Sequence, residues 1–336
     1  MQSESNANRT ERPSDIDWKS IDWKKVTRTV RNLRQRIFRA TQEGDWDKVQ
    51  SLQRLMLRST SNIAQSVRRV SQVNQGKNTP GVDKVLVKTS AERGKMLNHI
   101  INNTTPWRAV PVKRVYIPKA NGKQRPLGIP TIQDRALQAT VKNALEPAWE
   151  AQFEGTSYGF RPGRSAQDAI SQIWAIASYK VKTWVLDADI SGCFDNINHE
   201  HLLETIGTFP AKELIRQWLK AGYVEYGQRH ETLTGSPQGG VISPLLANIS
   251  LHGMEDALDI VYSKSGTSKS GHKAMKREGK SAVIRYADDF VVLCETEELA
   301  KRAGTPHHMA GSPRTTAING KDANRPPRQR VGLSWL

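Results

Sequence analysis

The chain has 336 residues, of which 37% are hydrophobic, 25% are charged and two are cysteine, and its formal net charge is +17. This composition excludes a disordered tail, a disulfide framework and a cysteine zinc site, and it indicates a sizeable buried core. The positive charge favours a polyanionic partner, with nucleic acid ahead of an acidic membrane because no amphipathic anchor or lipidation signal is evident.

The amino-terminal part predicts a short polar segment followed by basic helices. Residues 1–14 are polar and lack a secretory apolar segment, and no run approaches the length of a membrane span. We therefore expect disorder at the start of a cytoplasmic protein that has no membrane contact. From residue 15 to 98 we expect a helical region with a break at Gly44. Its second helix carries apolar residues at helical spacing, at Val49, Leu52, Leu55, Met56, Ile63, Val67 and Val70.

Arginines are interleaved with the apolar positions of these helices. A solvated basic face on a packed helical pair and an RNA-binding face fit this pattern equally well. The candidates for RNA binding are Arg28, Arg31, Arg54, Arg58, Arg68 and Arg69.

Residues 99–303 predict a mixed α+β domain. A strand over 112–119 and another over 123–130 flank the turn Ala120-Asn121-Gly122, and helices are expected over 132–149, 166–179 and 200–206. Lys119 and Arg125 lie on either side of the turn, where they could close on a triphosphate. Two solvated cations are the alternative reading.

The most informative segments carry carboxylates beside apolar runs. Asp189 ends the predicted strand 184–190, and Asp288 and Asp289 lie between the apolar runs 282–284 and 290–293. Two strands folding back at that point present Asp288 and Asp289 at a hairpin tip, where they could hold a divalent metal. Adjacent elements of this kind can form a two-metal phosphoryl-transfer site.

Strand geometry ranks the candidate metal ligands. Asp189 and Asp288 are the predicted direct ligands, and the peptide carbonyl of Ile190 is a further donor. Asp289 is the weaker ligand because neighbouring residues in a strand point to opposite faces. Asp187 lies on the same face of the predicted strand as Asp189, so the periodicity alone does not exclude it as a metal ligand. Carboxylates favour two Mg²⁺ ions, with Mn²⁺ as a substitute.

Five blocks in this order closely resemble the reverse transcriptases encoded by bacterial group II introns, also called intron maturases. The resemblance covers roughly residues 15–300. The blocks are Ile117-Pro118-Lys119 through Arg125-Pro126-Leu127-Gly128-Ile129-Pro130, then Ser157-Tyr158-Gly159-Phe160-Arg161-Pro162-Gly163-Arg164-Ser165, Asp189-Ile190-Ser191-Gly192-Cys193-Phe194-Asp195, Pro237-Gln238-Gly239-Gly240 through Asn248, and Tyr286-Ala287-Asp288-Asp289.

The resemblance implies a right-hand polymerase whose fingers and palm span 99–303, preceded by a helical extension over 15–98. It implies a palm triad of Asp189, Asp288 and Asp289. It also implies nucleotide-binding roles for further residues. Lys119 and Arg125 match the triphosphate-binding positions, Phe194 matches the ring that excludes a ribose 2′-hydroxyl, Gln238 lies near the nucleotide and template, and Ala287 lies beneath the primer end.

The implied activity is RNA-directed DNA polymerisation with dNTPs, primer DNA and a group II intron RNA template, together with a maturase role in binding that RNA. Residues 304–336 depart from the family because they are rich in turn formers and lack helical periodicity. We expect a disordered or frameshifted tail there and a missing thumb. The alternatives are a catalytically inactive RNA-binding remnant and a retron-type reverse transcriptase, and the oligomeric state stays open.

Overall fold

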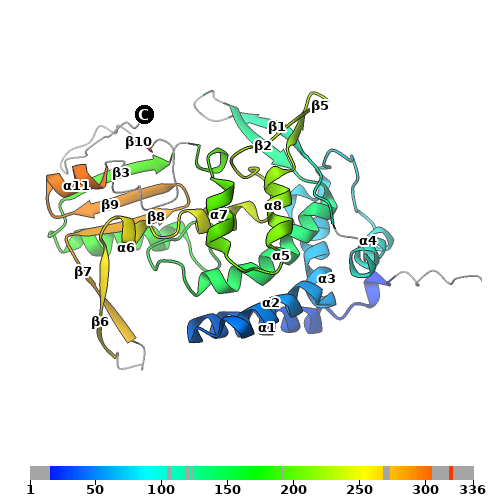
Figure 1. The fold of residues 1–336 in the computed structure, drawn as a ribbon, viewed down its shortest axis with the longest axis horizontal. Helices are drawn as coiled ribbons and strands as arrows, with labels where there is room; N and C mark the ends of the chain where they lie inside the picture. The colour runs from blue at the N-terminus through cyan, green and yellow to red at the C-terminus, as the bar shows by residue number, and fades with distance from the viewer. Residues whose placement is uncertain are drawn as a thin grey trace, which may run out of the picture.

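The computed structural model describes residues 16–103, 107–118, 122, 124–190, 192–267, 273–304 and 318–320. Helices and strands are interspersed along the chain, which confirms the α+β class (Figure 1). The helices are α1 (Trp23–Glu43), α2 (Trp46–Arg58), α3 (Thr60–Arg68), α4 (Ser90–Asn102), α5 (Ile132–Glu150), α6 (Ala166–Ser178), α7 (His199–Ile206), α8 (Lys212–Lys220), α9 (Ser243–Ser250), α10 (Met254–Ala257) and α11 (Glu297–Ala303). The strands are β1 (Val112–Pro118), β2 (Gln124–Ile129), β3 (Trp184–Ile190), β4 (Tyr223–Glu225), β5 (Gln228–His230), β6 (Val261–Thr267), β7 (Lys273–Glu278), β8 (Ser281–Tyr286), β9 (Asp289–Cys294) and β10 (Ile318–Gly320).

The amino-terminal helices begin and end at residues with clear capping roles. The Asp22 side chain accepts a hydrogen bond from the Lys25 backbone N–H at the start of α1, and Gly44 ends α1 in the left-handed conformation with φ 74°. The predicted break at Gly44 is confirmed. The expected single second helix is wrong in one respect, because Ser59 ends α2 and caps α3 by accepting from the Asn62 N–H.

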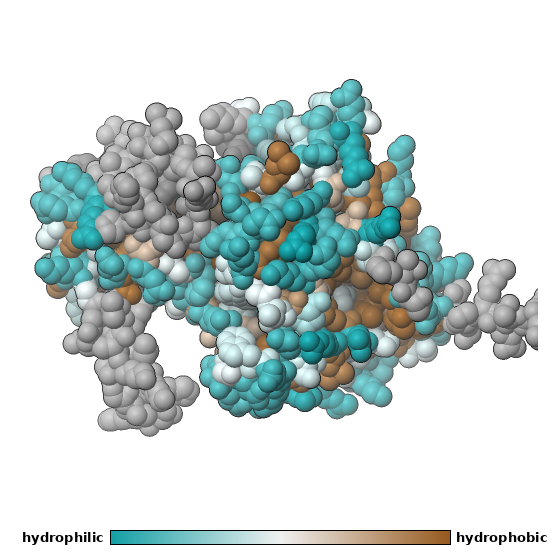
Figure 2. All heavy atoms as spheres, viewed as in Figure 1, coloured by the Kyte–Doolittle hydropathy of each residue, from teal (hydrophilic) through white to brown (hydrophobic). Residues whose placement is uncertain are grey.

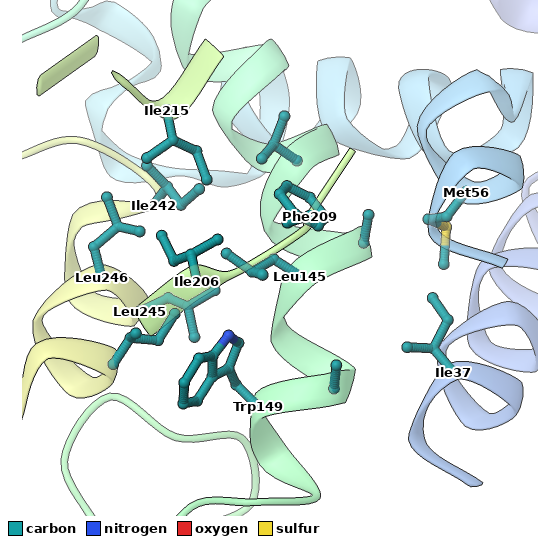
Figure 3. Close-up of a cluster of buried hydrophobic side chains, with 14 of the residues drawn as sticks. Ile37, Met56, Leu145, Trp149, Ile206, Phe209, Ile215, Ile242, Leu245 and Leu246 are labelled. Atoms are coloured by element: carbon teal, nitrogen blue, oxygen red, sulfur yellow. The ribbon is translucent and has the colours of Figure 1, made fainter. Parts of the chain in front are cut away.

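The largest core lies around α5, which connects the amino-terminal helices to the rest of the molecule. Figure 3 shows Leu145 and Trp149 of α5 between Ile37 and Met56 on one side and the residues of α7 to α9 on the other. All of these side chains are buried. Because both groups of helices pack on one helix, the amino-terminal region shares its core with the domain that follows it.

Sheet A has the order β2-β1-β4-β5. β1 and β2 pair antiparallel from Lys113 opposite Ile129 to Pro118 opposite Gln124, which confirms the predicted hairpin. β4 adds to the other edge of β1 in parallel, with Val112 opposite Tyr223. Sheet A therefore joins two segments that lie about a hundred residues apart in the chain.

Sheet B has the order β10-β3-β9-β8, and its central pair, β3 and β9, runs antiparallel (Figure 1). On one face, Leu186, Ala188 and Ile190 belong to a buried cluster with the segment that follows α9 and with α11. On the other face, α6 packs over apolar residues of β8 and β9, including Ile284 and Leu293. Because side chains alternate between the two faces of a strand, sheet B packs apolar side chains on both of its faces.

Hydrophilic side chains lie along α1 and α2 at the lower edge of the view in Figure 2. Both cysteines, Cys193 and Cys294, are buried free thiols. Among the described residues, no helix is both long enough and apolar enough to cross a membrane. Of the segment 304–336, the described residues are 304 and 318–320, so the predicted domain limits, the disordered tail and the missing thumb stay predictions.

Leu145→Ala should test the shared core. Leu145 is 1% exposed, and its truncation should lower the free energy of unfolding by about 2–5 kcal/mol. Leu55→Ala on α2 is the matched control, because Leu55 is 51% exposed and its truncation should cost less than about 1 kcal/mol. Urea unfolding followed by circular dichroism measures both. Equal losses would contradict the assignment of Leu145 to the core.

Candidate active site

The acidic turn lies between β8 and β9. Tyr286 and Asp289 form the last pair of the two strands, so Ala287 and Asp288 make a two-residue turn. Ala287 has φ +60° while Asp288 does not have positive φ, the combination found in type II′ turns. The hairpin tip predicted from the flanking apolar runs is confirmed, with Asp288 in the turn and Asp289 at the first position of β9.

The β3–β9 register brings the upstream carboxylate to this turn. Asp189 lies directly opposite Asp289, and the Ile190 N–H donates to the Asp288 carbonyl oxygen at 3.0 Å. Residues directly opposite each other point to the same face of a sheet. Asp189 and Asp289 therefore share a face, and Asp288 lies in the adjoining turn. Asp187 points to that face too, two residues before Asp189 on β3 and opposite Val291.

The electrostatics of Cys193 reflect the same grouping. Burial, together with the negative charges of Asp288, Asp189 and Asp195, raises the pKa of its thiol to about 12. Asp189 and Asp288 are half-buried and Asp289 is exposed. Water and a cation can therefore reach these carboxylates.

The carboxylates are not gathered into a metal cluster in this structure. Among the described residues, no group of three or more histidine, cysteine, aspartate or glutamate side chains is arranged to hold an ion. The donor set nevertheless fits a hard divalent cation, since it consists of carboxylate oxygens on one face and one adjoining turn. A bound cation would have to draw these side chains closer together.

Phe194 lies in a short 3-10 helix (Cys193–Asp195) that follows the end of β3 at Ile190. Its half-buried ring meets the ring of Phe160 edge to face, with centroids 6.2 Å apart. Phe160 is 48% exposed and has φ +62°. Sequence reasoning gave Phe160 no role, and the signal that could have found it is its place directly after Gly159 in the second matching block.

Gly159 allows a close approach to the acidic turn. A Cβ atom at this position would overlap the backbone nitrogen of Ala287. The segment that carries Phe160 is therefore packed against the turn that carries Asp288. This contact joins the second and fifth matching blocks in space.

Two of the residues expected near the incoming nucleotide, Arg125 and Gln238, lie on β2 and on the loop before α9. The Gly128 N–H donates to the Gln238 carbonyl oxygen at 2.7 Å, so this loop is held against β2. Gln238 is half-buried, and Arg125 is exposed on the same strand as Gly128. Lys119 lies outside the described residues.

Arginines line a groove of about 750 Å³ between α1, α3 and α5, which we call the basic groove. Arg31, Arg34, Arg39 and Arg69 contribute to its lining, and Glu146 and Glu150 also line it. Arg34 pairs with Glu146 at 2.6 Å, whereas Arg31, Arg39 and Arg69 are exposed.

A second hollow of about 340 Å³ lies beside the basic groove and shares Arg69 with it. There the Arg68 guanidinium lies 4.4 Å from the ring centroid of Trp23. The other three predicted arginines line neither hollow. They are Arg28, which is exposed, Arg54, which donates to Gln50, and Arg58.

Comparison with known proteins matches two family models to the chain. One, described as reverse transcriptase (RNA-dependent DNA polymerase), matches residues 117–308, and the other, the N-terminal domain of reverse transcriptase, matches residues 18–100. Protein YkfC of Escherichia coli (strain K12) is 36% identical over 250 residues, which are 67% of this chain and 66% of that protein.

Group II intron-encoded protein LtrA of Lactococcus lactis subsp. cremoris is 42% identical over 188 residues, which are 54% of this chain and 31% of that protein. The chain thus spans less than two thirds of the length of either relative. A solved structure of apo telomerase from Candida Tropicalis aligns with 62% of this chain and 47% of its own, at a TM-score of 0.35 and 14% identity.

Proposed function

Because the chain belongs to the reverse transcriptase family, we propose that it is an RNA-directed DNA polymerase of group II intron origin. In this reaction the 3′-hydroxyl of a primer attacks the α-phosphorus of a dNTP and pyrophosphate leaves, on a group II intron RNA template. The observation that carries the proposal is the cross-strand pair of Asp189 and Asp289 beside the turn that contains Asp288. Members of this family generally use divalent metal ions.

In this proposal Asp189 and Asp288 are the main ligands of two Mg²⁺ ions, with Mn²⁺ as a substitute, and the Ile190 carbonyl and Asp289 complete the site. When bound there, two such ions would activate the attacking hydroxyl and stabilise the leaving oxygen of the triphosphate. The chain itself supplies orientation, because Asp189 is fixed by pairing within sheet B and Asp288 by the two-residue turn.

The incoming dNTP is proposed to lie between β2 and the acidic turn. Arg125 and Lys119 neutralise the triphosphate, and Gln238 contacts the nucleotide and template. Phe194 excludes a ribose 2′-hydroxyl, and Ala287 supports the primer end. The edge-to-face contact with Phe160 supports this role of Phe194, since it fixes the plane of the ring.

The basic groove is the part of the chain that we propose for binding intron RNA in the maturase role. Its exposed arginines suit the phosphate backbone, and Trp23 with Arg68 in the neighbouring hollow adds a surface on which a base could stack. A cytoplasmic location belongs to the same proposal.

A non-catalytic RNA-binding protein is the second candidate. The basic groove favours this candidate, because α1, α3 and α5 form it and none of Asp189, Asp288 and Asp289 lines it. RNA binding could therefore persist without polymerisation.

Asp288→Asn should abolish primer extension on an RNA template. We expect a loss of about 1,000-fold or more with Mg²⁺, because a neutral amide is a far weaker ligand than a carboxylate. Asp47→Asn, an exposed position on α2, is the control and should extend like the parent chain. If the folded parent chain binds RNA but never extends the primer, with Mg²⁺ or with Mn²⁺, the second candidate replaces the polymerase.

Phe194→Ala should relax the choice of sugar. Removing the ring opens space for a 2′-hydroxyl, so discrimination against ribonucleotides should fall by about 10- to 100-fold. Competing dNTP and rNTP in single-nucleotide extension measures the ratio. Tyr226→Ala is the control, since Tyr226 is 95% exposed on the β4–β5 turn. Unchanged discrimination in the Phe194 variant would remove this residue from the nucleotide site.

The basic groove can be tested by the salt dependence of RNA binding. Arg31→Ala combined with Arg69→Ala should reduce the slope of log K against log salt by about 1.4, or about 0.7 for each lost phosphate contact. Arg54→Ala combined with Arg58→Ala is the comparison pair, because neither residue lines the groove. Equal changes for both pairs would contradict the placement of RNA in the groove.

A further inference from the structure

Arg285 is the most deeply buried arginine near the acidic turn. It lies on β8 two residues before Ala287 and is 2% exposed. Burial lowers the pKa of its guanidinium to about 10, so the side chain stays charged at neutral pH. A buried charge is costly to a folded protein, and an apolar residue at such a position often gives an equal or more stable core. Core packing alone therefore does not account for an arginine here.

One guanidinium nitrogen connects the turn to a neighbouring helix. Nη1 of Arg285 donates to the Ala287 carbonyl oxygen at 3.2 Å and to the Asn248 Oδ1 atom at 3.0 Å. These two bonds use both hydrogens of that nitrogen. Asn248 is fully buried on α9, so the turn is tied to a rigid element.

Asn248 extends the connection to the segment on the other side of the turn. Its Nδ2 atom donates to the Gly159 carbonyl oxygen at 2.9 Å. Gly159 is the residue that lies against the Ala287 backbone without space for a Cβ atom. Ala287 is thus held by the arginine on one side and by this glycine on the other.

The backbone of Arg285 holds the same segment. Its N–H donates to the Thr156 carbonyl oxygen at 2.9 Å, and its carbonyl oxygen accepts from the Tyr158 N–H at 2.8 Å. The segment therefore adds to the edge of β8 as a short parallel bridge at Ser157. The last residues of β8 are anchored immediately before the turn begins.

The charge of Arg285 is balanced by a fixed carboxylate. Nη2 lies 4.0 Å from an oxygen of Glu154, whose other oxygen accepts from the backbone N–H groups of Gly253 and Glu255. Nη2 itself has no hydrogen-bond partner among the described residues. The hydrogen bonds of Nη1, to the turn and to Asn248, are therefore closer contacts than the ion pair of Nη2 with Glu154.

We propose that Arg285 is a positioning residue that, through Asn248 and Ala287, fixes the acidic turn and so holds Asp288 beside the end of β3 that carries Asp189. The effect of Arg285 on catalysis rests on the proposed polymerase function. Its effect on the position of the acidic turn does not. Lysine keeps the charge near Glu154 but lacks the planar fork of donors, so it cannot reproduce the two bonds of Nη1 in their present geometry.

Arg285→Lys is the first test, with Arg93→Lys as the matched control. Arg93 is a buried arginine on α4 that donates to Ser71, away from the acidic turn. Hydrogen exchange of the metal-free proteins is the readout that needs no activity. The Ile190 amide, which donates to the Asp288 oxygen, should exchange about tenfold faster in Arg285→Lys, while the far ends of β3 and β9 keep the parent rate. Arg93→Lys should leave the Ile190 amide unchanged.

Primer extension, normalised by active-site titration, is the second readout. In Arg285→Lys the rate per active site should fall by about 10- to 100-fold and the Mg²⁺ concentration for half-maximal rate should rise, as for residues that orient metal ligands. A parent-like Mg²⁺ dependence with parent-like Ile190 exchange would overturn the proposal. Exchange that rises uniformly over sheet B would also overturn it, since that result indicates a structural role only. If the parent chain does not extend primers, the polymerase function fails, and the exchange data alone decide on Arg285.

Gly159→Ala disturbs the same turn without removing a buried charge, and it serves if Arg285→Lys does not fold. The added methyl group would push on the Ala287 backbone, so Ile190 exchange and the Mg²⁺ dependence should change in the same direction. Gly155→Ala is the control in the same loop, because a Cβ there meets nothing within 4 Å. Identical behaviour of the two glycine variants would contradict the proposed contact with the turn.

Discussion

The antiparallel register of β3 and β9 is the constraint on which the candidate site depends. It sets Asp189 opposite Asp289, and the turn that follows from the β8–β9 pairing brings Asp288 beside them. Because side chains alternate along a strand, the same register sends Ala188 and Ile190 into the core on the other face. The acidic residues and the core residues are therefore positioned by one set of backbone hydrogen bonds.

The surrounding elements stabilise that register from both sides of the sheet. The segment after α9, together with α11, covers one face, and α6 covers the far end of the other. Among the described residues, the apolar cluster under α6 does not reach the end of the second face that carries Asp189 and Asp289. This division explains how a hydrophobic sheet can keep carboxylates within reach of water and cations at one end only.

Much of this arrangement could be predicted from the sequence, because it depends on local pattern. The apolar runs on both sides of Ala287 and Asp288 predicted the hairpin, and the limits of α5 differ from the expected helix by a single residue. Less could be predicted where a local preference competes with a periodic pattern. Ser59 interrupts the expected second helix because its side chain caps α3, and Leu55 is half exposed despite its helical spacing.

Contacts between distant segments could not be predicted from one sequence. Nothing in the spacing of Gly159, Asn248 and Arg285 indicates that they meet, because 89 residues separate the first two and 37 the last two. The basic groove has the same origin, since Arg31 and Arg69 come from different helices that pack on α5. The sequence pattern marks the residues that carry charge, and the packing of the helices determines which of them face one another.

The β3–β9 register also explains why the core and the acidic site depend on each other. A slip of one residue between β3 and β9 would turn Asp187 and Asp189 into the cluster that now holds Leu186, Ala188 and Ile190. Burying two unpaired carboxylates would cost far more than the few kcal/mol by which a domain is stable. The apolar residues of sheet B thus enforce the pairing of Asp189 with Asp289. The core on one face of the sheet specifies the geometry of the carboxylates on the other.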